Sequence, residues 1–385
     1  MTTLSLASHE KICLAAQPLF QVRLVIMIEH ELADGVSSIP AEDWNRLVGQ
    51  ESPFLEWEWL ASLEEAGNVS AQTGWDARPL LVREDGNLVA ACPLYLKQHS
   101  EGEFVFDWGW AQAAESAGIE YYPKMLVAVP FTPVTGGRFL VAPEAERSSW
   151  LEYLGRCLRE TCVGNELSGV HVNFCRADEI EALEKQGYLI RSGLQYHWTN
   201  NNYASFEDYL QHFRSKRRNQ IRRERRELES QNVVIETYTG ESIPDSLFPP
   251  MYEFYLSTIR HNPWGRQYLN FPLFELLRDS FRERLVFIVA RRNDEFIGGT
   301  FNVVKGDTLY GRYWGATEEL RFLHFNVCYY AAVEHCIDHG IQRFEPGAGG
   351  AYKQLRGFDA QPTYSAHFLR DPRLSAAVER FLEAE

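Results

Sequence analysis

The stretch "FIVARRNDEFIGGTFNVVKGDTLYGRYWGA", residues 287–316, decides the predicted fold, because "LLVREDGNLVAACPLYLKQHSEGEFVFDWGWA" at 80–111 repeats its pattern. Each stretch predicts a strand, a polar turn, a strand, a loop and a third strand. Each ends in a Trp–Gly pair, Trp108–Gly109 in the first and Trp314–Gly315 in the second. The turns are rich in Asp, Asn or Gly, as hairpins require. Two copies of one antiparallel meander predict an internal duplication.

The segments on either side of the two stretches agree as well. An amphipathic helix is expected ahead of each meander, and a second helix and a short strand after it. This order is similar to that of the GNAT acyltransferase core. We therefore predict an α+β fold with tandem duplicated GNAT-like domains and a cleft between them. The alternative is that an unrelated α+β chain shows this order by chance. The expected flanking elements are helices at 53–67, 148–164, 271–283 and 323–340 and strands at 169–175 and 342–347.

The repeat also predicts the domain boundaries. Residues 1–20 form an N-terminal extension, and the first strand is expected at roughly Gln21–Glu29. A first GNAT-like domain spans 21–200 and differs from its counterpart by an insertion at 113–147. A second GNAT-like domain, opened by a basic helix, spans 201–385.

Composition and charge limit the classes of function. Of the 385 residues, 45% are apolar and 24% charged, which is usual for a globular protein. A net charge of -15 argues against a protein that coats DNA. Seven cysteines without a CxxC pair indicate reduced core residues and no metal site. Polar residues interrupt the apolar stretch 12–28, and no segment is long enough to span a membrane. We expect a cytoplasmic protein.

One local feature opposes this acidic balance. The stretch "SKRRNQIRRERREL" at 215–228 belongs to a run of eight Lys and Arg between Arg214 and Arg226. Spacing predicts i,i+4 ion pairs Arg223–Glu227 and Arg225–Glu229 in its second half. Arg217 and Arg218, in the uncompensated first half, are candidates for binding an anionic substrate. A solvated helix face and an RNA-binding module are the alternatives.

The sequence gives no motif for a cofactor. A loop of the form Gln/Arg-x-x-Gly-x-Gly/Ala would hold the pyrophosphate of acetyl-CoA, but "GATEELRFLHFNV" at 315–327 has no such glycines. The second half nevertheless resembles the Fem-type peptidyltransferases, through its basic helix and through "FEPGAGGAYKQLRGF" at 344–358. Nearly the whole chain resembles a Fem-related, GNAT-like bacterial family labelled peptidoglycan biosynthesis/recognition. The motifs of this resemblance are "PLYLKQHSEGEFVFDWGWA", "YYPKM", "PFTPVTGGR", "LYGRYWGA", "LHF" and "KQLRGF".

The resemblance implies an acyl- or aminoacyltransferase that modifies an amine of a small anionic or peptidoglycan-precursor substrate. Acyl-CoA and aminoacyl-tRNA are the candidate donors that it implies. The chain departs from the family at Asn326, where a Glu is expected, and at "GAGGAYK", 347–353, where a Gln and a Glu-His usually precede the Lys. A non-catalytic binding protein of the same fold, which recognises an envelope precursor, is the rival interpretation.

Candidate site residues of the first half surround the insertion. The stretch "YYPKMLVAVPFTPVTGGR" at 121–138 combines Pro, Gly, Thr and aromatic residues, which predicts a rigid loop. Lys124 and Arg138 could bind a phosphate or carboxylate there, unless the loop is only a structural crossover. The other candidates in this half are Thr132 and Thr135 as hydrogen-bond donors and His99 and Asp107 as proton acceptors.

Candidates of the second half follow the two family motifs. Period two places Tyr310 and Arg312 on one face of a strand, where Arg312 could clamp an anion or form a structural ion pair. Glycines next to a Lys and an Arg suit anion binding. No Ser-His-Asp or Cys-His constellation is visible, so we expect direct transfer in an aligned cleft. The remaining candidates are Trp314 and His324 for substrate binding, Glu345 and Lys353 for catalysis, and Arg356 for substrate binding.

Overall fold

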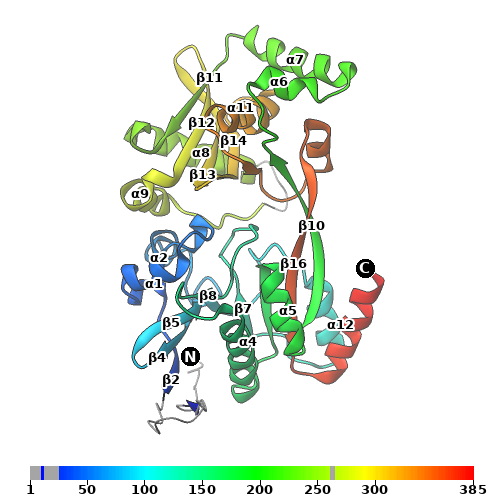
Figure 1. Ribbon diagram of the computed structural model, residues 1–385. Helices are drawn as coiled ribbons and strands as arrows, with labels where there is room; N and C mark the ends of the chain where they lie inside the picture. Colours follow the sequence, from blue (N-terminus) through cyan, green and yellow to red (C-terminus); the bar gives the residue numbers. More distant parts are fainter. Residues whose placement is uncertain (1–9, 13–25, 261–264) are drawn as a thin grey trace, which may run out of the picture. The chain divides into compact units, whose positions relative to one another are not determined.

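The computed structural model describes residues 10–12, 26–260 and 265–385. The chain forms two compact units (Figure 1). Unit 1 comprises Met1–Gly193 and Thr363–Glu385, and unit 2 comprises Leu194–Pro362.

This division differs from the predicted one at the end of the chain. The second domain was expected to reach residue 385, but Thr363–Glu385 belongs to unit 1. The reason is strand pairing, since β16 (Asp359–Leu369) lies antiparallel to β9 (Gly169–Cys175). The expected first strand is observed from Ile26 onward, and Gln21 to Val25 lie outside the described residues. The expected cleft between the domains stays a prediction.

Unit 1 contains two sheets. The first has the strand order β1-β2-β4-β5-β8, and the second places β16, β9, β7, β6 and β3 side by side. In the second sheet β7 and β9 are parallel, with Met125 opposite Val170. The other strands are β1 (Glu10–Ile12), β2 (Ile26–Leu32), β3 (Trp75–Ala77), β4 (Leu80–Glu84), β5 (Asn87–Cys92), β6 (Leu94–Lys97), β7 (Lys124–Val127) and β8 (Leu140–Val141). The helices are α1 (Ala41–Val48), α2 (Trp57–Glu65), α3 (Trp108–Ser116), α4 (Arg147–Gly164), α5 (Ala177–Lys185) and α12 (Pro372–Ala384).

The predicted meander of the first half is only partly correct. β4 and β5 form the expected hairpin. The strand expected to end at Trp108–Gly109 is wrong, because α3 begins at Trp108. The backbone carbonyl of Asp107 accepts hydrogen bonds from the N–H groups of Trp110 and Ala111, and an Ala-rich segment then favours helix. Strand β7, after α3, pairs antiparallel with β6 instead.

Unit 2 has one sheet with strand order β11-β12-β13-β14-β15-β10. The predicted meander is confirmed as β12, β13 and β14, which are antiparallel, and β15 then lies parallel to β14. The strands are β10 (Leu189–Thr199), β11 (Val234–Thr239), β12 (Leu285–Arg292), β13 (Glu295–Lys305), β14 (Thr308–Ala316) and β15 (Arg343–Glu345). The helices are α6 (Phe206–Gln211), α7 (Ser215–Glu229), α8 (Phe248–Arg260), α9 (Phe271–Ser280), α10 (Leu323–Phe325) and α11 (Ala331–Asp338), with a π-helical turn at Asn326–Tyr330.

Apolar residues on both faces of β12 explain how helices come to cover both sides of this sheet. Phe287 packs against Phe248 of α8, whereas Ile288 belongs to the core that includes Val333 of α11. A strand that is apolar on both faces is typical of a sheet covered on both sides. Only glycine fits at position 315, in the second Trp–Gly pair, because a Cβ there would lie 1.7 Å from the carbonyl oxygen of Phe254 in α8.

The described cysteines fit the expectation of reduced core residues. All six of them, Cys92, Cys157, Cys162, Cys175, Cys328 and Cys336, are free and buried, and Cys13 lies outside the described residues. Within the described ranges, no helix has the length and apolar character needed to cross a bilayer.

Candidate functional site

The parallel strands of unit 2 diverge and leave a cavity between them. β14 and β15 pair only over Thr308–Tyr310 and Arg343–Glu345, after which β14 continues to Ala316 paired with β13 and no longer with β15. The register with β13 shifts here, since Asn302 lies opposite Gly311 and Phe301 opposite Tyr313. Arg312 is therefore the extra residue of a β-bulge, a feature that often re-aims a side chain next to a functional site. The cavity beside it has a volume of about 250 Å³.

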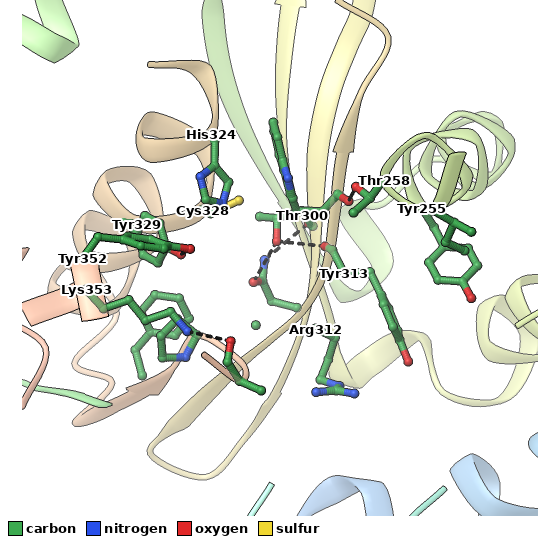
Figure 2. Close-up of a pocket in the computed structure, with 17 residues that line it drawn as sticks. Tyr255, Thr258, Thr300, Arg312, Tyr313, His324, Cys328, Tyr329, Tyr352 and Lys353 are labelled. Carbon is green, nitrogen blue, oxygen red and sulfur yellow. Dashed lines mark hydrogen bonds between the residues drawn. The ribbon is translucent and has the colours of Figure 1, made fainter. Parts of the chain in front are cut away.

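Aromatic side chains form part of the cavity wall (Figure 2). His324 lies 4.7 Å from the ring of Trp314, measured between centroids, and also contacts the ring of Tyr329. Burial, together with the cations Arg356 and Lys353, lowers the pKa of His324 to about 4, so its imidazole is neutral at pH 7. The side chains that line the cavity are those of Tyr255, Thr258, Ile259, Thr300, Asn302, Arg312, Tyr313, Trp314, His324, Cys328, Tyr329, Phe344, Pro346, Ala348, Tyr352 and Lys353, together with Gly311.

Lys353 is held by the glycine-rich loop that precedes it. Its Nζ donates to the carbonyl oxygens of Gly347, at 2.6 Å, and Ala348, at 3.2 Å (Figure 2). Gly347, Gly349 and Gly350 all have positive φ, which lets the backbone curl around the amine. Burial lowers the pKa of Lys353 to about 8. Lys353 is thus a cavity amine that can change protonation close to neutral pH.

The π-helical turn presents Cys328 to the same cavity. Such turns are frequent at functional sites. Burial raises the pKa of the Cys328 thiol far above its ordinary value, so the protonated thiol is the stable form. Asn326, at the position where a Glu was expected, does not line this cavity. Its amide donates to the carbonyl oxygens of Glu224 and Phe322.

Several predicted residues of unit 2 lie elsewhere. Tyr310 and Arg312 do not share a face of the strand, because the bulge separates them, and only Arg312 lines the cavity. Glu345 ends β15 outside the lining, where burial raises the pKa of its carboxyl to about 7 although Arg343 and Arg312 oppose the shift. Arg217 and Arg218 donate to Gln220 and Gln211 and do not line the cavity either.

Arg356, which was expected to bind substrate, contacts several groups of its own chain. The Arg356 side chain is buried, and its guanidinium donates to the Tyr330 hydroxyl and the Tyr352 carbonyl oxygen. It also pairs with Glu224 of α7, at 3.4 Å, and lies 3.5 Å from the centroid of the Phe325 ring. These contacts bind the basic helix to the loop that carries Lys353. Arg356 thus has a structural role in unit 2, and substrate binding by this residue stays a prediction.

The predicted helix-internal ion pairs are also wrong. Arg225 pairs with Glu334 of α11 at 2.9 Å, and Glu227 with Arg321 at 3.4 Å. Arg222, expected to lack an acid, pairs with Glu207 of α6. Tertiary partners replace the i,i+4 ones because α7 packs against the rest of unit 2 through its acidic and apolar face.

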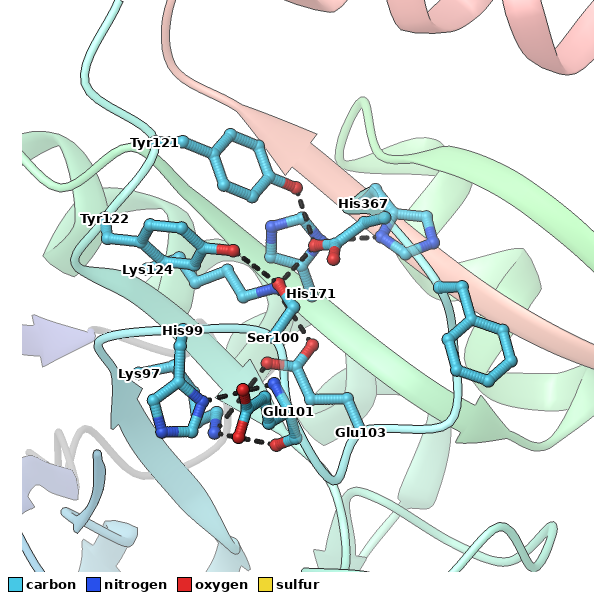
Figure 3. Close-up of polar contacts among 12 residues, drawn as sticks. Lys97, His99, Ser100, Glu101, Glu103, Tyr121, Tyr122, Lys124, His171 and His367 are labelled. Atoms are coloured by element: carbon cyan, nitrogen blue, oxygen red, sulfur yellow. Dashed lines mark hydrogen bonds and ion pairs between the residues drawn. The ribbon is translucent and has the colours of Figure 1, made fainter. Parts of the chain in front are cut away.

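In unit 1 the structure brings Asp107 and Lys124 together in a buried network (Figure 3). The Nζ of Lys124 donates to the carboxylates of Asp107 and, at 2.9 Å, Glu103, and to the hydroxyl of Ser100. Burial favours the neutral form of Lys124, but the two carboxylates outweigh it and raise its pKa. Burial likewise opposes ionisation of Asp107, yet Lys124 lowers the pKa of that carboxyl below its usual range. Lys124 therefore binds carboxylates of its own chain rather than a substrate.

Lys97 belongs to the same network, but burial makes its charged form unfavourable. Its side chain is fully buried, its Nζ lies 3.6 Å from the centroid of the Trp75 ring, and the nearest carboxylate, Glu103, is 3.9 Å away. Burial lowers the pKa of Lys97 to about 7, from an ordinary 10.5. Between these values the unfolded chain binds a proton that the folded chain does not. The free energy of unfolding must therefore rise with pH across this window.

Replacing Lys97 by Met should remove that rise. We expect wild-type protein to gain about 2 kcal/mol of unfolding free energy between pH 7.5 and 9.5 relative to Lys97→Met, measured by urea unfolding. Lys216→Met, at an exposed position of α7, is the control and should keep the wild-type pH dependence. An unchanged pH dependence in Lys97→Met would contradict the assigned shift.

The other first-half candidates have different surroundings. His99 accepts a hydrogen bond from the backbone N–H of Glu101 at Nδ1 and donates from Nε2 to the carbonyl oxygen of Thr73, so both ring nitrogens are used. The Thr132 hydroxyl donates to the Pro130 carbonyl, whereas the buried hydroxyl of Thr135 has no hydrogen-bond partner among the described residues. Catalysis by His99 and ligand binding by the two threonines stay predictions.

Arg138 lies in the loop that follows the parallel strand pair of unit 1. After the parallel pairing of β7 with β9 ends at Val127, the insertion runs along the end of β9. The Arg138 guanidinium is fully buried and donates to the carbonyl oxygens of Asn173, Gly136 and Val134. These three bonds engage all three nitrogens of the guanidinium with backbone carbonyls, and anion binding by Arg138 stays a prediction.

Comparison with known proteins assigns the chain to a family. A family model described as peptidoglycan biosynthesis/recognition matches residues 35–385. The chain belongs to this FemAB-like family. No curated protein matches the sequence significantly.

Solved structures show that the FemAB-like chain shares its fold with distant relatives. FemX matches with a TM-score of 0.55 at 11% identity, covering 89% of this chain and 98% of that one. The C-terminal domain of a putative lysylphosphatidylglycerol synthetase from Agrobacterium fabrum matches with a TM-score of 0.56 at 11% identity, covering 90% and 96%. At such identities the likeness concerns the fold. The predicted tandem GNAT-like α+β fold is confirmed.

Sequence reasoning missed much of the cavity of the FemAB-like protein. Of the candidates, Arg312, Trp314, His324 and Lys353 lie together there. Cys328 was expected in the core with the other cysteines, and Tyr329 was not among the candidates, because a π-helical turn has no clear sequence signal. Tyr352 adjoins Lys353 and is half exposed at the cavity, so the motif around Lys353 could have drawn attention to it.

Proposed function

We propose that this FemAB-like protein transfers an acyl or aminoacyl group to an amine, and that the reaction takes place in the cavity between β14 and β15. The observation that carries the proposal is the cavity beside β14 in unit 2, which brings Lys353, Arg312 and His324 together.

The cavity has the groups that amine acylation needs. Transfer to an amine requires alignment of the amine with the acyl carbon, a group that takes its proton, and donors for the developing oxyanion. Lys353, with a pKa of about 8, is suited to accept the proton in its neutral form. Arg312 supplies a cationic donor at the opposite wall (Figure 2).

The size of the cavity limits what enters it. A volume of about 250 Å³ lies below the range of typical drug-sized ligand sites, so it suits a small acyl or aminoacyl end and not a whole carrier molecule. We propose that the carrier, whether acyl-CoA or tRNA, stays outside the cavity. The acceptor would be an amine on a small anionic or peptidoglycan-precursor molecule, consistent with the family description. A binding protein without catalysis is the second candidate, since that description includes recognition.

The experiment compares Lys353→Met with a matched Lys305→Met at the end of β13, outside the cavity lining. Acyl-CoA, aminoacyl-tRNA and nucleotide-linked muropeptides are first screened for binding, and transfer is then followed by the mass of the acceptor. We expect Lys353→Met to lower turnover by 10²- to 10⁴-fold with little change in donor binding, and Lys305→Met to behave as wild type. Wild-type turnover should rise with pH toward about 8. Loss of binding with no turnover in any protein would favour the recognition role instead.

A further inference from the structure

Helix α7, whose place in unit 2 is shown in Figure 1, carries a row of exposed residues, most of them basic. Its buried side consists of Ile221, Glu224 and Leu228. On a different face of the helix, exposed residues recur every three or four positions. They are Lys216, Asn219, Arg223 and Arg226.

The charges on this face are not neutralised within the protein. Two acids of the helix are bound elsewhere, since Glu224 binds Tyr330 and Arg356, and Glu227 pairs with Arg321, whereas Glu229 at the end of the helix is exposed. Among the described residues, no carboxylate forms an ion pair with six of the eight cations of the run. These six are Arg214, Lys216, Arg217, Arg218, Arg223 and Arg226.

The position of these cations on the helix is unfavourable by itself. Arg214, Lys216, Arg217 and Arg218 stand at the N-terminus of α7, and the first turn contains no acidic residue. The positive end of the helix dipole repels cations there. Packing does not explain their presence, because only Arg217 and Arg218 are half buried and both contact neutral glutamines. An anionic partner outside the protein would remove both the repulsion between these cations and the unfavourable dipole interaction.

The geometry fits a polyanion with regularly spaced charges. From Lys216 to Arg226 the exposed row is about 15 Å long, given a rise of 1.5 Å per residue. A nucleic-acid strand carries one phosphate per roughly 3.4 Å of helix axis, so the row matches several successive phosphates. A membrane is the less suitable partner, because helices that insert in a lipid interface expose apolar side chains. The apolar residues of α7 are instead buried in unit 2.

We propose that the exposed basic face of α7, formed by Lys216, Arg223 and Arg226 with Arg214 and Arg218 at its flank, docks the phosphodiester backbone of a nucleic acid. Because the rest of the chain is acidic and repels phosphates, we expect this contact to be limited to the surface of α7. The proposal concerns binding only and does not depend on whether the cavity of unit 2 transfers an acyl group.

The test measures binding of the full chain to fluorescently labelled RNA and DNA hairpins of equal length by anisotropy, at 50 to 200 mM salt. The variant replaces Lys216, Arg223 and Arg226 by Gln. The control replaces Lys185, Arg373 and Arg380 of unit 1 by Gln, which changes the net charge equally. We expect the α7 variant to bind at least ten-fold more weakly, while the control variant binds like wild type. The slope of log binding constant against log salt concentration should also be smaller for the α7 variant, by the equivalent of about two to three phosphate contacts.

Two results would overturn the proposal. One is equal binding by the α7 variant and the control variant. The other is absence of hairpin binding by wild-type protein at 50 mM salt. In the second case, the protein is sedimented with vesicles of 30% phosphatidylglycerol in phosphatidylcholine. If the wild-type protein binds these vesicles and the α7 variant does not, the partner of α7 is an anionic membrane surface.

Discussion

Replacing Lys124 by Met is expected to destabilise the protein by about 3 to 5 kcal/mol, because it leaves the buried carboxylates of Asp107 and Glu103 without their cation. Both carboxylates are almost completely shielded from solvent. Lys97 cannot substitute, since it lies 3.9 Å from Glu103 and burial lowers its pKa to about 7. Urea unfolding of the full chain measures the effect.

A second variant separates charge from packing. Adding Glu103→Gln and Asp107→Asn to Lys124→Met removes the uncompensated charges, so the triple variant should recover a large part of the lost unfolding free energy. A loss of less than 1 kcal/mol in Lys124→Met alone would show that water reaches these carboxylates and that the network is not buried as described.

Replacing Arg356 by Met should have a similar effect in unit 2, about 3 kcal/mol, because Glu224 then remains buried with only hydrogen-bonding partners. The matched control is Arg218→Met, whose side chain contacts only the Gln211 amide, and we expect a change within about 0.5 kcal/mol. Thermal and urea unfolding without any ligand measure both. If Arg356→Met unfolded like wild type but lost ligand binding, the earlier assignment of Arg356 to substrate binding would be restored.

The sequence predicted the fold well where its pattern is local. The turn "RRNDE" and the alternating strands around it specify the hairpin of β12 and β13, which the structure confirms. The prediction of a third strand in the first half was wrong. The stretch "FVFDWGWA" alternates like a strand, but the Ala-rich segment after Trp108 continues as α3. The return of β16 to unit 1 could not be predicted either, since pairing with β9 joins residues about two hundred positions apart.

Candidate site residues were predicted less well, for a physical reason. Arg138, Arg356 and Lys124 combine charge with unusual sequence surroundings, which suggested ligand binding. Buried cations need the same surroundings, because each must find carboxylates or carbonyls inside the protein. Sequence alone does not distinguish a cation that binds its own chain from one that binds a ligand. Arg312 and Lys353 were chosen on the same grounds, and they line the cavity.

The most direct test of the proposed site is a crystal structure of the full chain soaked with small donor fragments. Acetyl-CoA represents one donor class, and a non-hydrolysable aminoacyl-adenosine represents the end of aminoacyl-tRNA. We predict that the acyl or aminoacyl group of one of them lies between β14 and β15, within hydrogen-bond distance of Arg312 or Lys353. Density for that group beside the loop around Arg138 in unit 1, with the cavity of unit 2 unoccupied, would contradict the account.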